Sequence, residues 1–438
     1  MAVPIQQTEF KARRAELMRQ MGPNSIAILV AAPEYLRNAD THYTYRQNSD
    51  FYYLTGFKEP YAAAVFVPGR AEGEFIFFNQ TNNLDLEIWI GKRIGQEGAC
   101  QDYGADEAYP IEQLNEKIPE LMKNKKTLYF PIGSCSQFDK QVSDWLNMIR
   151  RGVRAGFSAP EQMINVSHII HEMRLIKSEA EIALMRHSSE LSAQAHINGM
   201  KKAKHLKYEY QVEAEVWHHL AVNGFRSWAY DPIVGAGENT CVLHYGKNDA
   251  SLKSGDLLLV DAGGEYEYYA ADITRTYPIN GKFSSEQKAI YELVLKSQKA
   301  GIEAIKPGLP WNAAQKVIIR VLTEGLVELG LLKGSVEELI EKEEYKLFYM
   351  HNSGHWLGLD VHDVGSYKVN EEWRLLKPGM ALTIEPGLYI KENKKIDARW
   401  WNIGVRIEDD VLVTETGAEV MTASVPKEVH EIELIMRD

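Results

Sequence analysis

Four acidic residues lie at the ends of apolar, strand-like runs in the second half of the chain. Asp261 directly follows the run from Leu257 to Val260, and Asp272 lies in the expected returning strand of the same hairpin. Glu385 ends the stretch "MALTIEPG", and Glu408 lies within "GVRIEDDVLV". Ionised side chains are rarely buried unless they are paired or bind a metal. A fold that buries these strands must therefore group the carboxylates or leave each one facing water.

Each of these residues has a simpler explanation when it is taken alone. Asp261 can cap a strand and face water, and a glutamate before Pro-Gly is most often a turn residue. However, the segment "HNSGHWLGLDVHDVG" places His351, His355 and His362 close together in a chain that has only 13 histidines. The simpler explanation would have to hold independently at every position, which favours a common site.

Two aspartates, two glutamates and one histidine form an oxygen-rich ligand set. Such a set can hold two divalent ions about 3.5–4 Å apart by sharing carboxylates, and can lower the pKa of a water between them to near neutral. The three cysteines, Cys100, Cys135 and Cys241, are too few and too far apart for a thiolate cage or a disulfide framework. An HExxH zinc site is excluded because position 352 is Asn. The residues therefore predict a hydrolytic metal centre held by oxygen and nitrogen.

A length of 438 residues predicts two domains. Residues 1–172 have a mixed α/β pattern, in which the runs "SIAILVAA", "AAAVFVP", "EFIFFN" and "TLYFPIG" are expected strands of one sheet. The pattern changes near residue 172, and Ser178 with Glu181 forms a capping-box signature that opens a long helix. We expect an N-terminal α/β domain over 1–172 and an α+β C-terminal domain over 173–438.

Two further helices and two groups of strands are expected in the second domain. One helix begins at about Ser284, and a second carries Ile318, Leu322 and Leu326 on one face. The strands lie in "DLLLVDAGGEYEYYAADITRTYPI" and "MALTIEPGLYI…NIGVRIEDDVLVTETG". In the expected strand "GVRIEDDVLV", successive side chains point to opposite faces, which predicts that Arg406 and Glu408 lie on one face.

Charge and hydropathy narrow the possible partners. A formal net charge of −12 argues against a nucleic-acid partner, which usually needs a basic face. The N-terminus is charged throughout without an apolar signal region, and no stretch of about 18 apolar residues follows. These features predict a cytoplasmic protein that does not bind a membrane.

Several strings, in this order and spacing, resemble the pita-bread metallopeptidases and most closely the aminopeptidase P (Xaa-Pro aminopeptidase) family. They are "YRQNSDFYYLTGF", "EIWIGKRIGQ", "VLHYG", "DAGGEY…DITRT", "GHWLGLDVHDVG", "TIEPGLY" and "GVRIEDD". The resemblance covers nearly the whole chain. It implies that the C-terminal domain has the pita-bread (creatinase/aminopeptidase) fold.

The resemblance also implies a ligand set for two divalent ions, of which manganese is the expected metal and cobalt, iron and zinc remain compatible. The implied ligands are Asp261, Asp272, His355, Glu385 and Glu408, with Asp272 and Glu408 bridging.

Other residues match positions that act on the substrate in this family. The implied catalytic residues are His244, His362 and Glu385, and the implied substrate-binding residues are Trp89, His351, Tyr389 and Arg406. Without the resemblance, a structural hydrogen bond is the better interpretation of His244, His351 and His362. Arg406 is expected to hold a ligand carboxylate, with a surface ion pair as the alternative.

The implied reaction is hydrolysis of the bond between an N-terminal residue and a following proline, so the partners are peptides with proline in second position. The runner-up is a prolidase, which accepts only Xaa-Pro dipeptides. Methionine aminopeptidase usually lacks a substantial N-terminal domain, and creatinase lacks the full ligand set. A non-catalytic pita-bread binding module is disfavoured because all five ligand positions are filled.

The family also implies a homotetramer, in which Trp89, expected in a strand, reaches the active site of another subunit.

Overall fold

The computed structural model describes residues 3–437. Its contacts divide the chain into two compact units, Ile5–Arg174 and a second unit that runs onward from Leu175 and also includes residues 3–4. The boundary expected from the sequence lies between residues 172 and 173, and the contacts divide after Arg174.

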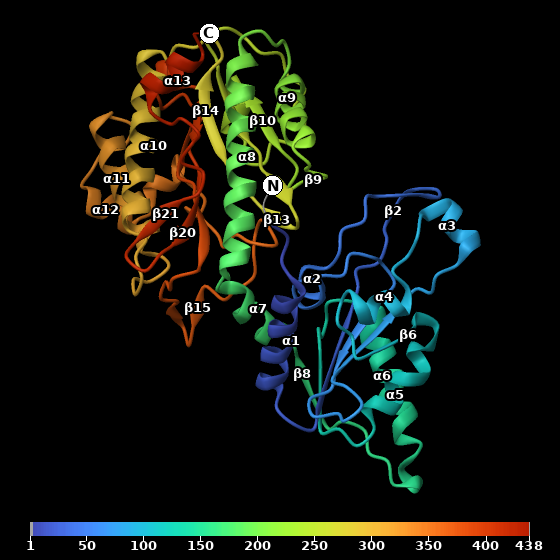
Figure 1. The fold of residues 1–438 in the computed structure, drawn as a ribbon. Coiled ribbons are helices and arrows are strands. Elements are labelled where there is room, and N and C mark those ends of the chain that lie inside the picture. Colours follow the sequence, from blue (N-terminus) through green and yellow to red (C-terminus); the bar gives the residue numbers. More distant parts are fainter. Residues whose placement is uncertain (1–2, 438) are drawn as a thin grey trace. The chain divides into compact units, whose positions relative to one another are not determined.

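The N-terminal unit is built on one six-stranded mixed sheet, in the order β6-β5-β4-β1-β7-β8 (Figure 1). The strands are β1 (Ser25–Val30), β4 (Ala63–Phe66), β5 (Phe75–Asn79), β6 (Glu107–Pro110), β7 (Thr127–Phe130) and β8 (Gln162–Asn165), with a separate hairpin of β2 (Leu36–Asn38) and β3 (Thr41–His42). The four apolar runs picked out in the sequence are β1, β4, β5 and β7, so their assignment to one sheet is confirmed. Their aromatic and aliphatic side chains suit a buried pleated surface.

α-Helices make up much of the rest of this unit. They are α1 (Gln7–Met21), α2 (Ser49–Thr55), α3 (Leu84–Ile90), α4 (Gly95–Gln101), α5 (Leu114–Met122), α6 (Ser136–Arg150) and α7 (Ser167–Leu175). The core on one side joins β1, β4, β5 and β7 to α5 and α6, with Trp145 only 1% exposed. The expectation that Trp89 lies in a strand is wrong, because the residue belongs to helix α3 and its side chain is 83% exposed.

The C-terminal unit places several small sheets between helices (Figure 1). The sheets are β10-β11-β14, β13-β12-β9, β17-β20-β21, β18-β19 and β15-β16. Their strands are β9 (Ser227–Trp228), β10 (Ile233–Ala236), β11 (Leu257–Asp261), β12 (Gly264–Tyr266), β13 (Tyr269–Ala270), β14 (Thr274–Pro278), β15 (Lys368–Val369), β16 (Glu372–Trp373), β17 (Ala381–Ile384), β18 (Gly387–Ile390), β19 (Ile403–Arg406), β20 (Asp409–Val413) and β21 (Ala418–Val420).

The helices of this unit are α8 (Glu179–Ala203), α9 (Glu209–Val222), α10 (Ser285–Glu303), α11 (Ala313–Glu328), α12 (Val336–Glu341) and α13 (Val429–Ile435). Helix α8 packs on β12 and β13, whereas α10 packs on β17, β18 and β19. The capping box of Ser178 and Glu181 is present at the start of α8, and Ser284 forms another with Gln287 at the start of α10. Both predicted helix starts are confirmed.

Two acidic residues lie outside the strands in which the sequence placed them. Asp272 precedes β14 instead of lying in it. The chain between β11 and β14 forms a second hairpin, β12–β13, so the strand that pairs with β11 begins only at Thr274. Glu408 lies between β19, which pairs with β18, and β20, which pairs with β17. The chain changes sheets at Ile407 and Glu408, so Arg406 and Glu408 do not share one continuous strand.

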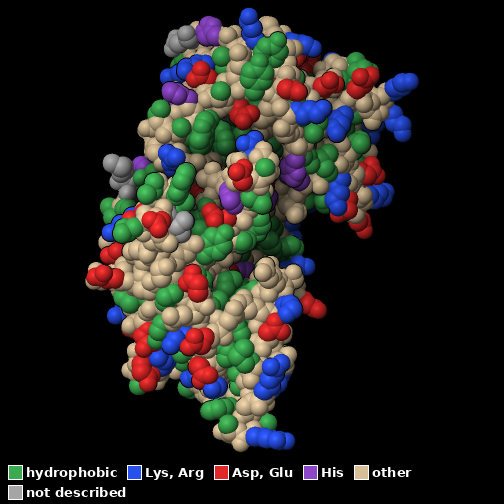
Figure 2. Space-filling model, turned by 90° about the vertical axis from the view of Figure 1, so that its right-hand side faces the viewer, with side chains coloured by type: hydrophobic (Ala, Val, Ile, Leu, Met, Phe, Trp, Pro, Cys, Tyr) green, Lys and Arg blue, Asp and Glu red, His purple; other side chains and the backbone are tan. Residues whose placement is uncertain are grey.

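Two further observations concern the hydropathy of the helices and the charge on the surface. None of the helices within residues 3–437 has the length and hydropathy needed to cross a membrane. On the face drawn in Figure 2, basic and acidic side chains are interspersed, and no continuous basic patch covers that face.

Candidate metal centre

The predicted site residues gather around one cavity of about 650 Å³ in the C-terminal unit. Its lining includes His244, Asp261, Asp272, His351, His355, His362, Glu385, Arg406 and Glu408. Tyr389 is absent from the lining, and Trp89 belongs to the other unit. Strand ends bring the carboxylates here, since Asp261 ends β11 and Glu385 follows β17.

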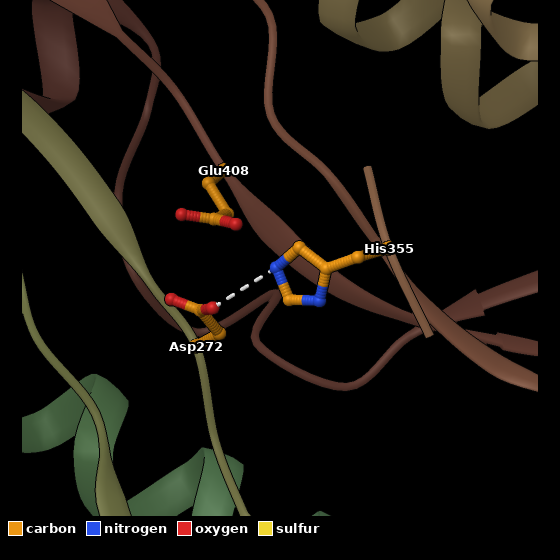
Figure 3. A group of neighbouring side chains, drawn as sticks. All are labelled: Asp272, His355 and Glu408. Carbon is orange, nitrogen blue, oxygen red and sulfur yellow. Dashed lines mark ion pairs between the residues drawn. The ribbon is translucent and has the colours of Figure 1, made fainter. Parts of the chain in front are cut away.

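Asp272, His355 and Glu408 form a group that could hold a metal ion (Figure 3). One ligand atom from each of them falls within 4.8 Å of the others. His355 Nε2 is 3.4 Å from Asp272 Oδ2 and 3.8 Å from Glu385 Oε1. Oxygen and imidazole ligands in this arrangement suit a divalent cation.

The carboxylates repel one another in a buried setting. Burial raises the pKa of Glu385 to about 7, although His355 and Arg406 oppose the shift. Burial and the neighbouring carboxylates raise the pKa of Glu408 well above its usual value, and burial also raises the pKa of Asp272. Bound cations would offset this concentration of negative charge, so the donor set fits divalent metal ions.

The His355 ring is held in one orientation. Its Nδ1 lies 3.0 Å from the Trp356 carbonyl oxygen, which can only accept, so Nδ1 carries a proton. Burial lowers the pKa of His355, but Asp272 and Glu385 outweigh it and raise the pKa to about 9. Nε2 therefore faces the carboxylates, the orientation that a metal-binding imidazole needs.

The structure adds residues that sequence reasoning missed. The Tyr230 hydroxyl lies 2.6 Å from Asp261 Oδ1 and 2.5 Å from Asp272 Oδ1, so it can donate to either aspartate. The Thr274 hydroxyl donates to Glu408 Oε2 at 2.7 Å. The Asp272 backbone N–H donates to the buried Asp410 carboxylate at 3.1 Å. No local pattern marks these residues, because their partners are distant in the sequence.

Arg406 is buried, being only 4% exposed, so the alternative of a surface ion pair is wrong. Its guanidinium donates to Asp261 Oδ2 at 2.5 Å and to the Tyr389 hydroxyl at 3.1 Å. Tyr389 Oη also lies 2.9 Å from His351 Nε2. Tyr389 is thus placed behind Arg406 and His351, and it is 1% exposed.

The three remaining histidines differ in their settings. Both His351 ring nitrogens have protein partners, because Nδ1 lies 2.7 Å from the Asn352 carbonyl. Burial, and then the charge of Arg406, lower the pKa of His351 to about 4. His244 and His362 are exposed in the cavity. The His362 ring lies edge-to-face with the His355 ring at 4.4 Å, and burial and the His355 charge lower the pKa of His362.

Comparison with known protein families identifies both parts of the chain. The family described as "Metallopeptidase family M24" matches residues 183–415, and that described as "Aminopeptidase P, N-terminal domain" matches residues 10–129.

Curated relatives match over the full length. The Xaa-Pro aminopeptidase of Escherichia coli is 44% identical over 99% of this chain and 98% of its own. The human Xaa-Pro aminopeptidase 3 is 32% identical over 98% of this chain and 86% of its own.

Solved structures agree with the fold. Pseudomonas aeruginosa aminopeptidase PepP superposes with a TM-score of 0.97 at 50% identity, covering 99% of both chains. Escherichia coli aminopeptidase P in complex with the inhibitor Pro-Leu superposes with a TM-score of 0.96 at 43% identity, again covering 99% of both chains.

Proposed function

The chain belongs to metallopeptidase family M24, with an aminopeptidase P N-terminal domain, and we propose that it is an Xaa-Pro aminopeptidase. Its reaction is hydrolysis of the bond between an N-terminal residue and a following proline. The full-length likeness to Xaa-Pro aminopeptidases supports this reaction. The observation that carries the catalytic part is the convergence of the four predicted carboxylates and four histidines on one cavity.

Two divalent cations are the proposed cofactors, held by Asp261, Asp272, His355, Glu385 and Glu408, with Asp272 and Glu408 shared. When bound, such ions lower the pKa of a water molecule and stabilise negative charge on a carbonyl oxygen. Manganese is the proposed metal, because the set is rich in oxygen.

The protein side chains divide the remaining work. Arg406 orients the Asp261 carboxylate through its hydrogen bond, and Tyr389 holds Arg406 and His351 in place. Glu385 is the proposed proton carrier. His362 and His244 face the cavity, where their ring nitrogens can bind the substrate carbonyl and transfer protons.

Activity on matched peptides tests this function. Metal-depleted protein is supplied with manganese, cobalt, iron(II) or zinc, and then given Xaa-Pro-Xaa tripeptides, Xaa-Pro dipeptides and Xaa-Ala-Xaa controls. We expect release of the first residue from the proline tripeptides, fastest with manganese. Cleavage of dipeptides alone would assign a prolidase. Binding of a tripeptide without cleavage, in protein of verified metal content, would instead support a binding module.

An oligomer is the proposed assembly, because helix α3 carries exposed apolar side chains. Leu84 is 80%, Ile88 82% and Trp89 83% exposed. Such a cluster marks a surface that another protein covers. The proposed partner is a second copy of the chain, in a tetramer built from dimers, with Trp89 reaching the active site of another subunit.

Replacing Trp89 by Glu is expected to shift the protein to smaller species and to reduce activity, because a charge opposes apolar burial. Light scattering and peptide kinetics on the same sample measure both effects. Met148→Glu changes another exposed apolar residue of the same unit, on α6, and serves as the control. A wild-type monomer with full activity would contradict the shared site.

A cytoplasmic location stays a prediction, consistent with the three free cysteines.

A further inference from the structure

A fully buried ion pair lies beside the metal centre without belonging to the ligand set. Lys177 Nζ is 2.9 Å from Asp363 Oδ2, and each side chain is 1% exposed. A buried pair gains little net stability, because removing two charges from water is costly. Fold stability alone therefore does not account for it.

The surrounding backbone is shaped to hold this pair. A Cβ on Gly358 would lie 2.3 Å from Asp363 Oδ2 and 2.9 Å from Lys177 Cε, so the pair packs directly against the glycine. The Lys177 backbone N–H donates to the Gly379 carbonyl at 2.8 Å. A Cβ on Gly365 would lie 2.8 Å from Leu175 Cδ1. The segment 175–177 is thus fixed against the loop that carries the histidines.

A shared hydrogen-bond acceptor connects the pair to the metal centre. The Trp356 carbonyl accepts from the Asp363 backbone N–H at 2.9 Å, and His355 Nδ1 lies 3.0 Å from the same oxygen. The position of Asp363 therefore sets the carbonyl that orients the His355 ring. His362 directly precedes Asp363, and its ring contacts the His355 ring at 4.4 Å.

We propose that the Lys177–Asp363 ion pair is a positioning device that holds the turn of residues 355–363, and with it the His355 and His362 imidazoles, in the geometry used for catalysis. The catalytic part of this inference rests on the proposed function, whereas the orientation of His355 toward a metal does not. Neither Lys177 nor Asp363 lines the cavity, so both act through other residues.

The test compares Lys177→Met with Lys177→Met/Asp363→Asn. The single variant leaves the buried Asp363 carboxylate without its lysine, whereas the double variant removes both charges at nearly constant volume and should recover most of the stability. Mn²⁺ affinity is measured on metal-depleted protein by competition with a chromophoric chelator. kcat and KM are measured on a proline tripeptide, and melting temperature on the same sample.

In both variants we expect Mn²⁺ affinity and kcat to fall by roughly 10–100-fold, the range typical of losing a partner that orients a ligand. KM should change little. In Lys177→Met alone, the melting temperature should also fall, on the order of 5–10 °C. If that variant does not fold, the double variant and Gly358→Ala, which keeps both charges but crowds Asp363, carry the test.

Leu326→Ala is the matched control, because this leucine of α11 is fully buried and lies outside the cavity lining. It should lower the melting temperature comparably without changing Mn²⁺ affinity or kcat. Wild-type Mn²⁺ affinity and kcat in the folded double variant would overturn the proposal and leave the pair a purely structural role. If the wild type cleaves no proline peptide, the proposed function fails, and the affinity measurement still decides whether the pair positions His355.

Discussion

Replacing Asp272 by Asn, or Glu408 by Gln, is expected to nearly abolish peptide hydrolysis while leaving the chain folded. Each change removes one negative charge from the group that Asp272, His355 and Glu408 form. A neutral amide is a poor ligand for two cations that share it. The loss of metal affinity should exceed the roughly 10–100-fold typical of losing an outer hydrogen-bond partner.

The stability of the metal-free protein should move in the opposite direction to activity. The folded-state pKa of Asp272 and of Glu408 is raised by burial, so the ionised form of each group is disfavoured by folding. For an acid with a raised pKa, the metal-free protein loses stability as the pH rises above the unfolded-state pKa. At neutral pH the amide variants without metal should therefore melt at the same temperature as the wild type or higher.

Three measurements on each variant check this prediction: steady-state hydrolysis of a proline tripeptide, metal content, and thermal unfolding with and without manganese. Glu328→Gln, at the exposed end of α11, makes the same chemical change away from the site and should behave as the wild type. Near wild-type turnover with a full complement of metal in either ligand variant would show that the five-ligand assignment is wrong.

Local signals explain why much of the fold was predictable. Strands β1, β4, β5 and β7 are short apolar runs bounded by turn residues. Such a run can be recognised as a buried strand from its own sequence, without knowledge of its partners. The start of α8 was marked by Ser178 and Glu181, whose reciprocal hydrogen bonds involve residues three apart.

Features that depend on distant partners could not be predicted. Glu408 falls between two sheets because β19 and β20 pair with different strands, and those pairings are not encoded in the segment itself. Similarly, "LDLEIWI" alternates like a strand but forms helix α3, since seven residues give only a weak periodic signal.

The same distinction between local signals and distant partners applies to the residues of the site. Asp261, Asp272, Glu385 and Glu408 were recognisable because a charge at the end of a buried strand is costly unless it has a partner. Tyr230 and Lys177 were not recognisable, because a single tyrosine or lysine is common in any sequence and its partner lies far along the chain. Residues that bind the metal thus leave a pattern of unusual residue types, whereas residues that orient them leave none.

Replacing His362 by Ala is expected to lower kcat by roughly two to three orders of magnitude, the effect typical of removing a hydrogen-bond donor to a developing oxyanion. The prediction follows from position: His362 is exposed in the cavity, and its ring stands against that of the proposed ligand His355. A side chain that faces an open cavity contributes little to core packing, so the melting temperature should change little.

A scaffold role for His362 predicts the reverse outcome. If its main work is to pack against His355 in the turn of residues 355–363, the alanine variant should lose stability and metal, and the rate per metal-loaded molecule should remain nearly intact. Kinetics on a proline tripeptide, metal content and thermal unfolding from one preparation separate the two roles. His430→Ala, an exposed histidine on α13, controls for the loss of an imidazole elsewhere in the same unit. Because removal of a donor acts on kcat and removal of a packing contact acts on stability, wild-type turnover with a lowered melting temperature would place His362 in the scaffold.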